Sequence, residues 1–119
     1  ILYYDYTKQQ LVEKQDSTPV IKFTADSVDY GKLSKSATNA FTLRFKNEGK
    51  FPFRIKEITS DCNCMRFYWD EKSIEANESG TINLLILTEE KQGKQKAFIR
   101  LNMQPEKSFI YPVYFEGVK

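Results

Sequence analysis

Hydrophobic and polar residues alternate along most of the chain after residue 20. Within residues 39–47, Phe41, Leu43 and Phe45 fall on one side of an extended chain, and polar residues stand between them. A strand with one buried face shows this period of two, so the segment is predicted to be a half-buried β-strand. The same alternation, or a short apolar run that fits a strand, covers residues 20–23, 53–60, 81–88, 96–103 and 109–117.

Turn-forming residues separate these segments. Gly31, Gly49, Gly80 and Gly93 each mark a predicted turn, and residues 104–108 form a further turn sequence around a proline. With no convincing helical pattern after residue 20, we expect about seven strands at intervals of about ten residues. This spacing is typical of an all-β, immunoglobulin-like antiparallel β-sandwich.

Two local features add detail to this prediction. The alternation slips at Glu57 and Ile58, which predicts a β-bulge. Pro112 has no N–H to donate, so the last strand is expected to lie at a sheet edge or to turn that position outward. The core is expected to contain Phe41, Leu43, Phe45, Ile55, Ile82, Leu84, Ile86, Leu101 and Phe115.

Residues 1–18 differ from the rest, because they are polar, rich in Gln and Lys, and without alternation. They are predicted to form a spacer or contact arm outside the sandwich of residues 19–119. Tyr3, Tyr4 and Tyr6 are candidates for docking on this domain or on a neighbouring protein. The chain starts with Ile1 rather than Met, which fits the removal of a signal peptide or an upstream lipid anchor.

Composition narrows the possible functions. The 119 residues fit one domain. The 18 basic and 16 acidic side chains are interspersed, so the electrostatic field of the protein is too weak to favour binding to nucleic acid or to an anionic membrane. The chain contains no histidine, which excludes Ser-His-Asp and Cys-His catalysis and the histidine-containing zinc sites. We therefore expect a protein that is not an enzyme and needs no cofactor.

An ordered set of short motifs runs through the chain and resembles a known family. The motifs are Tyr30-Gly31, Asn47 with Gly49, Ile55, Cys62 with Cys64, Trp69, Gly80 and Gly117-Val118. Their order resembles the bacterial domain-of-unknown-function family 1573, a group of Hydin-like, major-sperm-protein-like immunoglobulin folds. The chain departs from the family at Met65, where a threonine is usual, and at residues 77–80, where a Pro-Gly turn is usual.

The resemblance implies a compartment and no chemistry. The family's members are mostly exported or lipid-anchored envelope proteins with no established activity. The resemblance therefore implies a periplasmic protein, or an outer-membrane or cell-surface lipoprotein.

The two cysteines, Cys62 and Cys64, are one residue apart. In an extended strand their α-carbons would be about 6.5–7 Å apart, at or beyond the upper end of disulfide geometry. We therefore favour a structural interpretation, with two small buried groups beneath a core Trp69. A labile disulfide would form if Asn63 bends the chain, and a Cu(I) site of Cys62, Cys64 and Met65 is the other alternative, because thiolate and thioether sulfur suit soft metals.

Aromatic residues follow the cysteines. Phe67 and Trp69 are expected to share one face of a strand while Tyr68 takes the other. Phe67 and Tyr68, with Tyr3, Tyr4 and Tyr6, form a possible interaction surface. The favoured function is a non-enzymatic module that binds another envelope protein or a glycan through loops or a free edge strand. The alternative is an envelope protein that handles thiols or Cu(I) through the cysteine pair.

Overall fold

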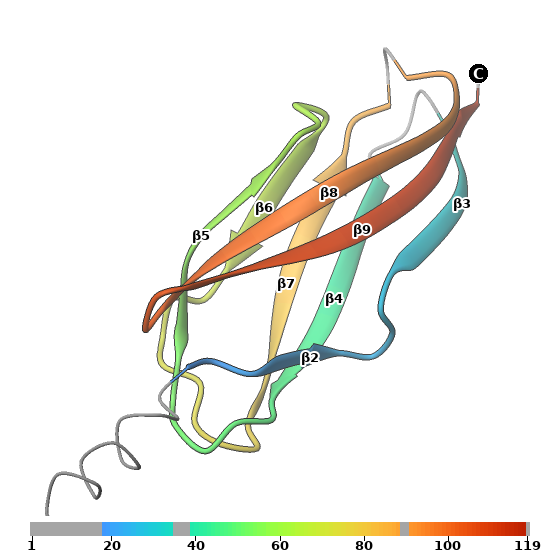
Figure 1. Cartoon of the computed structure of the whole chain (residues 1–119). Helices are drawn as coiled ribbons and strands as arrows, with labels where there is room; N and C mark the ends of the chain where they lie inside the picture. The colour runs from blue at the N-terminus through green and yellow to red at the C-terminus, as the bar shows by residue number, and fades with distance from the viewer. Residues whose placement is uncertain (1–17, 35–38, 89–90, 119) are drawn as a thin grey trace, which may run out of the picture.

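A computed structural model describes residues 18–34, 39–88 and 91–118. The predicted all-β fold is confirmed, with eight strands in the described residues rather than about seven (Figure 1). The strands are β2 (Ile21–Phe23), β3 (Val28–Ser34), β4 (Asn39–Asn47), β5 (Arg54–Ser60), β6 (Met65–Trp69), β7 (Ser79–Ile86), β8 (Gly93–Gln104) and β9 (Lys107–Val118).

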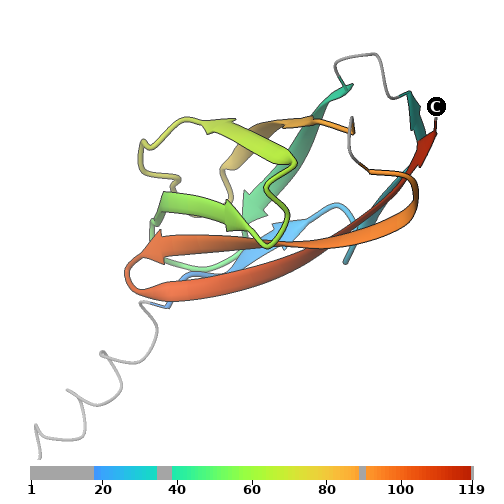
Figure 2. The same cartoon turned by 90° about the horizontal axis from the view of Figure 1, so that it is seen from above.

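The strands form two four-stranded sheets that pack face to face. Sheet one has the order β2-β4-β7-β6, and sheet two has the order β3-β9-β8-β5. Figure 2 shows the open edges of β5 and β6 on one side of the sandwich and β3 on the other. Neighbouring strands are antiparallel except β3 and β9, which pair in parallel, so the expectation of a wholly antiparallel sandwich is corrected at this pair.

The extra strand arises where the chain changes sheets. β2 pairs with β4 in sheet one, residues 24–27 cross over, and β3 then joins sheet two beside β9. The predicted turn at Gly31 is instead an irregularity inside β3, where the register shifts between Asp29 and Lys32 and Gly31 has a φ of 72°. Glycine adopts this left-handed conformation without the steric penalty of a side chain.

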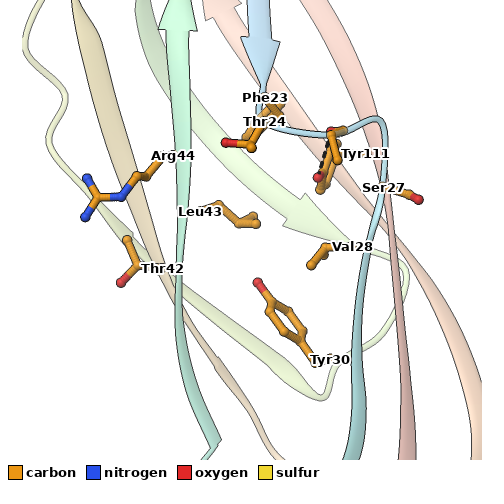
Figure 3. Close-up of a pocket in the computed structure, with 10 residues that line it drawn as sticks. Phe23, Thr24, Ser27, Val28, Tyr30, Thr42, Leu43, Arg44 and Tyr111 are labelled. Atoms are coloured by element: carbon orange, nitrogen blue, oxygen red, sulfur yellow. Dashed lines mark hydrogen bonds between the residues drawn. The ribbon is translucent and has the colours of Figure 1, made fainter.

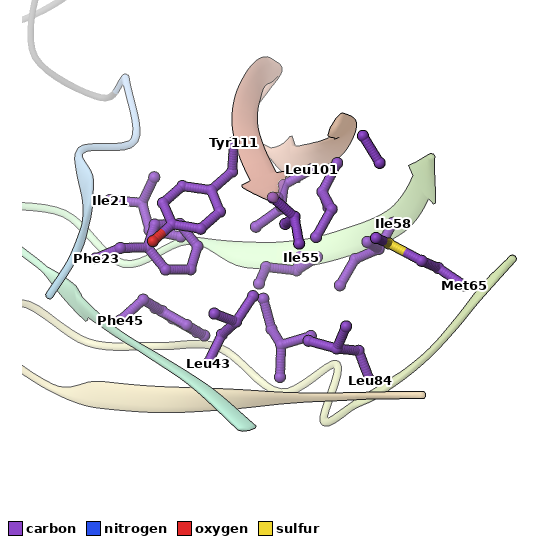
Figure 4. Close-up of a cluster of buried hydrophobic side chains, with 14 of the residues drawn as sticks. Ile21, Phe23, Leu43, Phe45, Ile55, Ile58, Met65, Leu84, Leu101 and Tyr111 are labelled. Atoms are coloured by element: carbon purple, nitrogen blue, oxygen red, sulfur yellow. The ribbon is translucent and has the colours of Figure 1, made fainter. Parts of the chain in front are cut away.

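The core lies between the sheets, as the alternation predicted (Figure 4). Of the nine expected core residues, Phe41 alone is not buried. Phe41 is half-buried and packs against the core, and its ring stacks on Tyr30 with 3.7 Å between the ring centroids, at the side of the sandwich where the chain changes sheets. The predicted bulge is present in β5, where the register shifts between Ile55 and Glu57.

Buried Asn47 ties the end of β4 to the next turns. Its side-chain amide donates to the carbonyls of Phe51 and Ile74, each at 2.9 Å, and its carbonyl oxygen accepts from the N–H of Gly49 at 2.9 Å. In the Asn-x-Gly motif, these hydrogen bonds satisfy the buried Asn47 side chain and hold the turn in place.

Gly80 is required by close approach of an aromatic ring. It lies opposite Phe45 in the β4–β7 pair, and a Cβ at this position would meet the Phe45 ring at 2.5 Å. A larger residue at position 80 would displace a core side chain.

β9 is an interior strand, so of the two alternatives for Pro112 the sheet edge is wrong, and the position is instead turned outward, between the buried Tyr111 and Val113. Pro112 stands opposite Phe98, whose carbonyl accepts a hydrogen bond from the Asp61 N–H and so points toward β5. The backbone nitrogen of Pro112, which carries no hydrogen, therefore faces away from β8 and toward the β3 side. Pairing with β3 begins only at Val113, so no ladder bond is lost at Pro112.

The predicted N-terminal arm, with Tyr3, Tyr4 and Tyr6, lies outside the described residues apart from its last residue. Within the described residues, no helix has the length and apolar character needed to span a membrane.

Candidate functional site

A groove runs between β5 and β6, the outermost strands of the two sheets on one side of the sandwich. Its volume is about 380 Å³. We call it the edge groove, and it is lined by Ile58, Thr59, Ser60, Cys62, Asn63, Met65, Arg66, Phe67 and Trp69. The candidate interaction residue Phe67 and one of the two cysteines, Cys62, therefore line the same groove.

The cysteines lie in the turn that closes one end of the edge groove. Cys62 and Cys64 form a disulfide, and their α-carbons are 5.1 Å apart. The expectation that a strand would hold them too far apart is corrected, because residues 61–64 form a turn and β6 begins only at Met65. Cys64 is buried, whereas Cys62 is half-exposed.

Hydrogen bonds fix this turn. The Cys62 N–H donates to the Ser60 hydroxyl at 3.1 Å, and the Cys64 N–H donates to the Cys62 sulfur at 3.2 Å. Arg66 closes the turn from outside, donating to the carbonyls of Asn63 at 2.8 Å and Met65 at 3.0 Å. The turn thus places a backbone donor on Cys62 Sγ, and the Arg66 guanidinium binds two carbonyls of the same segment.

The Cu(I) alternative depends on the state of the cysteines. In the disulfide, neither Cys62 nor Cys64 offers a thiolate, so metal binding would first require reduction. Met65 is buried, and its sulfur lies 3.9 Å from the Ser60 hydroxyl. Among the described residues, no group of three or more His, Cys, Asp or Glu side chains is placed to hold a metal ion.

Trp69 closes the other end of the edge groove. Its indole N–H donates to the Ile55 carbonyl of β5 at 2.9 Å, so the ring bridges the two sheets. Trp69 was expected to belong to the core, and it packs against the core while remaining half-buried. Phe67 shares its face and is also half-buried, while Tyr68 points outward with 57% of its surface exposed, as the alternation predicted.

The ladder between β6 and β7 decides which backbone groups face the open edge. The Leu87 N–H donates to the Cys64 carbonyl at 2.7 Å. Because hydrogen-bond direction alternates along an antiparallel pair, the backbone groups of Arg66 and Tyr68 also point toward β7. The groups that point away from β7, toward the open edge, belong to Met65, Phe67 and Trp69.

The β5 edge carries site residues that the sequence did not reveal. The Asp61 N–H donates to the Phe98 carbonyl of β8, so by the same alternation the backbone groups of Ile58 and Ser60 point to the open side. Edge position depends on the order of strands in the sheet, and the order is a long-range property. The break in alternation at Glu57 and Ile58 was the one local feature of the sequence that distinguished this strand.

Solved structures with this fold share little sequence with the chain. The PapD-like domain 7 of human CEP192 has a TM-score of 0.66 at 9% identity, over 83% of this chain and 85% of that one. The E. coli chaperone DraB has a TM-score of 0.64 at 12% identity, over 83% of this chain and 55% of that one. The periplasmic chaperone SfaE has a TM-score of 0.58 at 8% identity, over 84% of this chain and 59% of that one. The chain thus spans little more than half the length of these two chaperones, and the likeness shows the fold.

Comparison by sequence gives a more specific result. No curated protein matches the chain. The family model described as "Protein of unknown function (DUF1573)" matches residues 21–117, which include every strand from β2 to β8 and most of β9. The chain therefore belongs to the DUF1573 family.

Proposed function

We propose that this chain is a non-enzymatic interaction module of the bacterial envelope that binds an extended segment of another protein along β6. The observation that carries the proposal is the edge of β6, where the backbone groups of Phe67 and Trp69 and the N–H of Met65 point away from β7, while the Met65 carbonyl accepts from Arg66. Unpaired strand edges accept an added strand readily, because the incoming backbone satisfies their donors and acceptors.

The walls of the edge groove define the partner's chemistry. A strand added to β6 would direct every second side chain into the groove, toward Ile58, Met65 and Phe67, which are apolar. The other side chains would lie on the outer face beside Arg66 and Tyr68. The partner segment is therefore extended, with apolar residues at alternate positions, and this chemistry favours a protein over a glycan.

Two observations support an exported location. Disulfides persist in oxidising compartments such as the periplasm, and the Cys62–Cys64 bond fits that setting. SfaE, which shares the fold, is named a periplasmic chaperone. The location proposed is the periplasm, or the outer membrane or cell surface in lipid-anchored form.

The proposal is tested by placing a charge in the edge groove. A Phe67→Lys protein should lose the partners that the wild-type domain captures from an envelope extract, because an inward-facing lysine blocks strand addition. Phe98→Lys is the matched control, since Phe98 is exposed on the outer face of β8, outside the groove. Equal capture by both variants would contradict the proposal, as would a wild-type domain that retains glycans only.

Binding by strand addition also has a direct signature. In the complex with a captured partner, the Phe67 and Trp69 amides should become protected from hydrogen exchange, because they would enter a new ladder. Unchanged exchange at both amides in a stable complex would rule out strand addition as the binding mode.

A second candidate function is thiol–disulfide exchange, which one contact favours. The Cys64 N–H donates to Cys62 Sγ, and Arg66 lies beside the same turn, so both would stabilise a Cys62 thiolate. In the exchange, a partner dithiol would be oxidised to a disulfide while the Cys62–Cys64 bond takes up two electrons and two protons. The reduced pair with Met65 would then be the form able to bind Cu(I).

The redox candidate is tested by mass spectrometry of the native domain treated with a dithiol at neutral pH. Rapid formation of both thiols with the fold intact, followed by stoichiometric Cu(I) uptake that Cys62→Ser abolishes, would favour it. A disulfide that survives until the domain unfolds would leave the pair with a structural role.

A further inference from the structure

A second cavity lies on the side of the sandwich opposite the edge groove, where the chain crosses from β2 to β3 (Figure 3). Its volume is about 300 Å³. We call it the crossover pocket, and its inner wall is formed by Phe23, Val28, Tyr30, Leu43 and Tyr111. Because Phe23 and Leu43 come from sheet one and Tyr111 from sheet two, the pocket opens into the space between the sheets.

The Tyr30 hydroxyl is buried and has no hydrogen-bond partner among the described residues. Its ring is held in place by stacking on Phe41, and in Figure 3 the hydroxyl points into the pocket, toward Leu43 and Val28. Tyr111, on the opposite wall, differs in this respect, since its hydroxyl donates to the Ala25 carbonyl at 3.0 Å. Buried hydroxyls are nearly always paired, so the lone donor of Tyr30 is unusual.

The unpartnered hydroxyl is a neutral donor. Burial raises the pKa of Tyr30 to about 12, and the neighbouring Tyr111 adds to the rise. At physiological pH the group therefore offers a proton and needs an acceptor. A ligand that supplied this acceptor would remove the penalty of an unsatisfied buried donor.

The other residues of the pocket wall determine the polarity, charge and size of the ligand that would fit. The side chains that face inward are apolar or aromatic, and Arg44, the one charged residue of the lining, points outward in Figure 3 from the solvent face of β4. The volume matches the lower end of small-molecule sites, which begin at about 300 Å³. A charged ligand would find no counter-ion on the inner wall.

From these features we propose that the crossover pocket binds a small, neutral, apolar molecule whose carbonyl or similar oxygen accepts a hydrogen bond from Tyr30. The pocket lies between β2, β3 and β4, away from β5 and β6, so this binding site is independent of partner docking at the edge groove. The proposal for the crossover pocket and the proposal for the edge groove can therefore be refuted separately.

The test compares two probes of nearly equal shape. Acetophenone carries a carbonyl acceptor, whereas α-methylstyrene has a CH₂ group in place of that oxygen. Titration of the full chain, followed by amide NMR, should shift the signals of Phe23, Val28 and Leu43 with both probes. Acetophenone should bind about five- to tenfold more tightly, because it alone satisfies the Tyr30 donor.

Two variants locate the effect. Tyr30→Phe removes the hydroxyl and keeps the ring, so it should bind the two probes equally. Tyr114→Phe, which alters a tyrosine of β9 outside the pocket lining, should keep the wild-type preference for acetophenone. Absence of binding, shifts confined to other parts of the domain, or a preference that persists in Tyr30→Phe would each overturn the proposal.

Discussion

Asn47 shows how one polar side chain fixes several segments. It has no exposed surface, and its backbone also takes part, because its N–H donates to the Glu78 carbonyl and its carbonyl accepts from the Asn77 N–H. One residue thus connects the end of β4, the following turn and the loop before β7. The sequence marked Asn47 as a turn residue through its Asn-x-Gly context, but its long-range partners lie too far along the chain to be read from local pattern.

Asn47→Ala should destabilise the domain by about 2–3 kcal/mol, because it removes three side-chain hydrogen bonds, to Phe51, Gly49 and Ile74, and leaves the Ile74 carbonyl with the Phe53 N–H as its remaining donor. Urea unfolding monitored by circular dichroism measures the change. Asn83→Ala is the control: Asn83 is exposed on β7 and accepts one hydrogen bond from Thr42, so its loss should be well under 1 kcal/mol. Equal losses for the two variants would show that the Asn47 hydrogen bonds carry no special weight.

Tyr30 should make stability depend on alkaline pH. Its pKa rises from 10.0 to about 12 on folding, so between these values the unfolded chain releases a proton that the folded chain retains. Stability is therefore lost as pH rises from about 10 to about 12. The free energy of unfolding of wild type should fall more steeply over this range than that of Tyr30→Phe, measured by urea unfolding at each pH. Parallel curves would contradict the assignment.

Among the strands, alternation predicted most elements and most of the core, because burial on one face leaves a local trace. β3 was missed as a strand since its pairing with β9 is parallel and brings together residues that are far apart in the chain. The turn of Cys62 and Cys64 was only the less favoured alternative, because the sequence fits an extended continuation of β5 equally well. On the β6 side, the sequence singled out Cys62, Met65, Phe67 and Trp69, which all line the edge groove, but it did not show that β5 forms the opposite wall.

The ladder of β6 makes a prediction at this scale. In the free domain the Arg66 and Tyr68 amides should exchange slowly, because they point toward β7, whereas the Phe67 and Trp69 amides should exchange much faster. Hydrogen exchange followed by NMR resolves the alternation. Uniformly slow exchange along β6 would mean that its outer edge is already covered in the free protein.

At the scale of the whole molecule, the predicted arm of residues 1–18 can be separated from the sandwich. The arm lacks a core-facing pattern, and the family match begins only at residue 21. Its deletion should therefore change the melting temperature by less than about 2 °C, well below the shift of roughly 4–8 °C that accompanies a loss of 1 kcal/mol in a domain of this size. Differential scanning calorimetry of the two proteins decides the point.

A larger drop on deletion would mean that the arm's tyrosines pack against the domain. Deletion of residues 1–22, which also removes the buried Pro19 and Ile21, is the contrasting variant and should lower the melting temperature clearly. Together the two deletions locate the N-terminal limit of the folding unit.

The parallel pairing of β3 with β9 has a mechanical consequence. These strands lie near the two ends of the sandwich sequence and run in the same direction, so tension applied from both ends would slide them past each other lengthwise. Their register pairs, from Val28 opposite Val113 to Ser34 opposite Val118, would then bear the load together instead of opening one after another. Two strands paired in this way resist pulling in shear, so the β3–β9 pair should oppose extension of the domain along its strands.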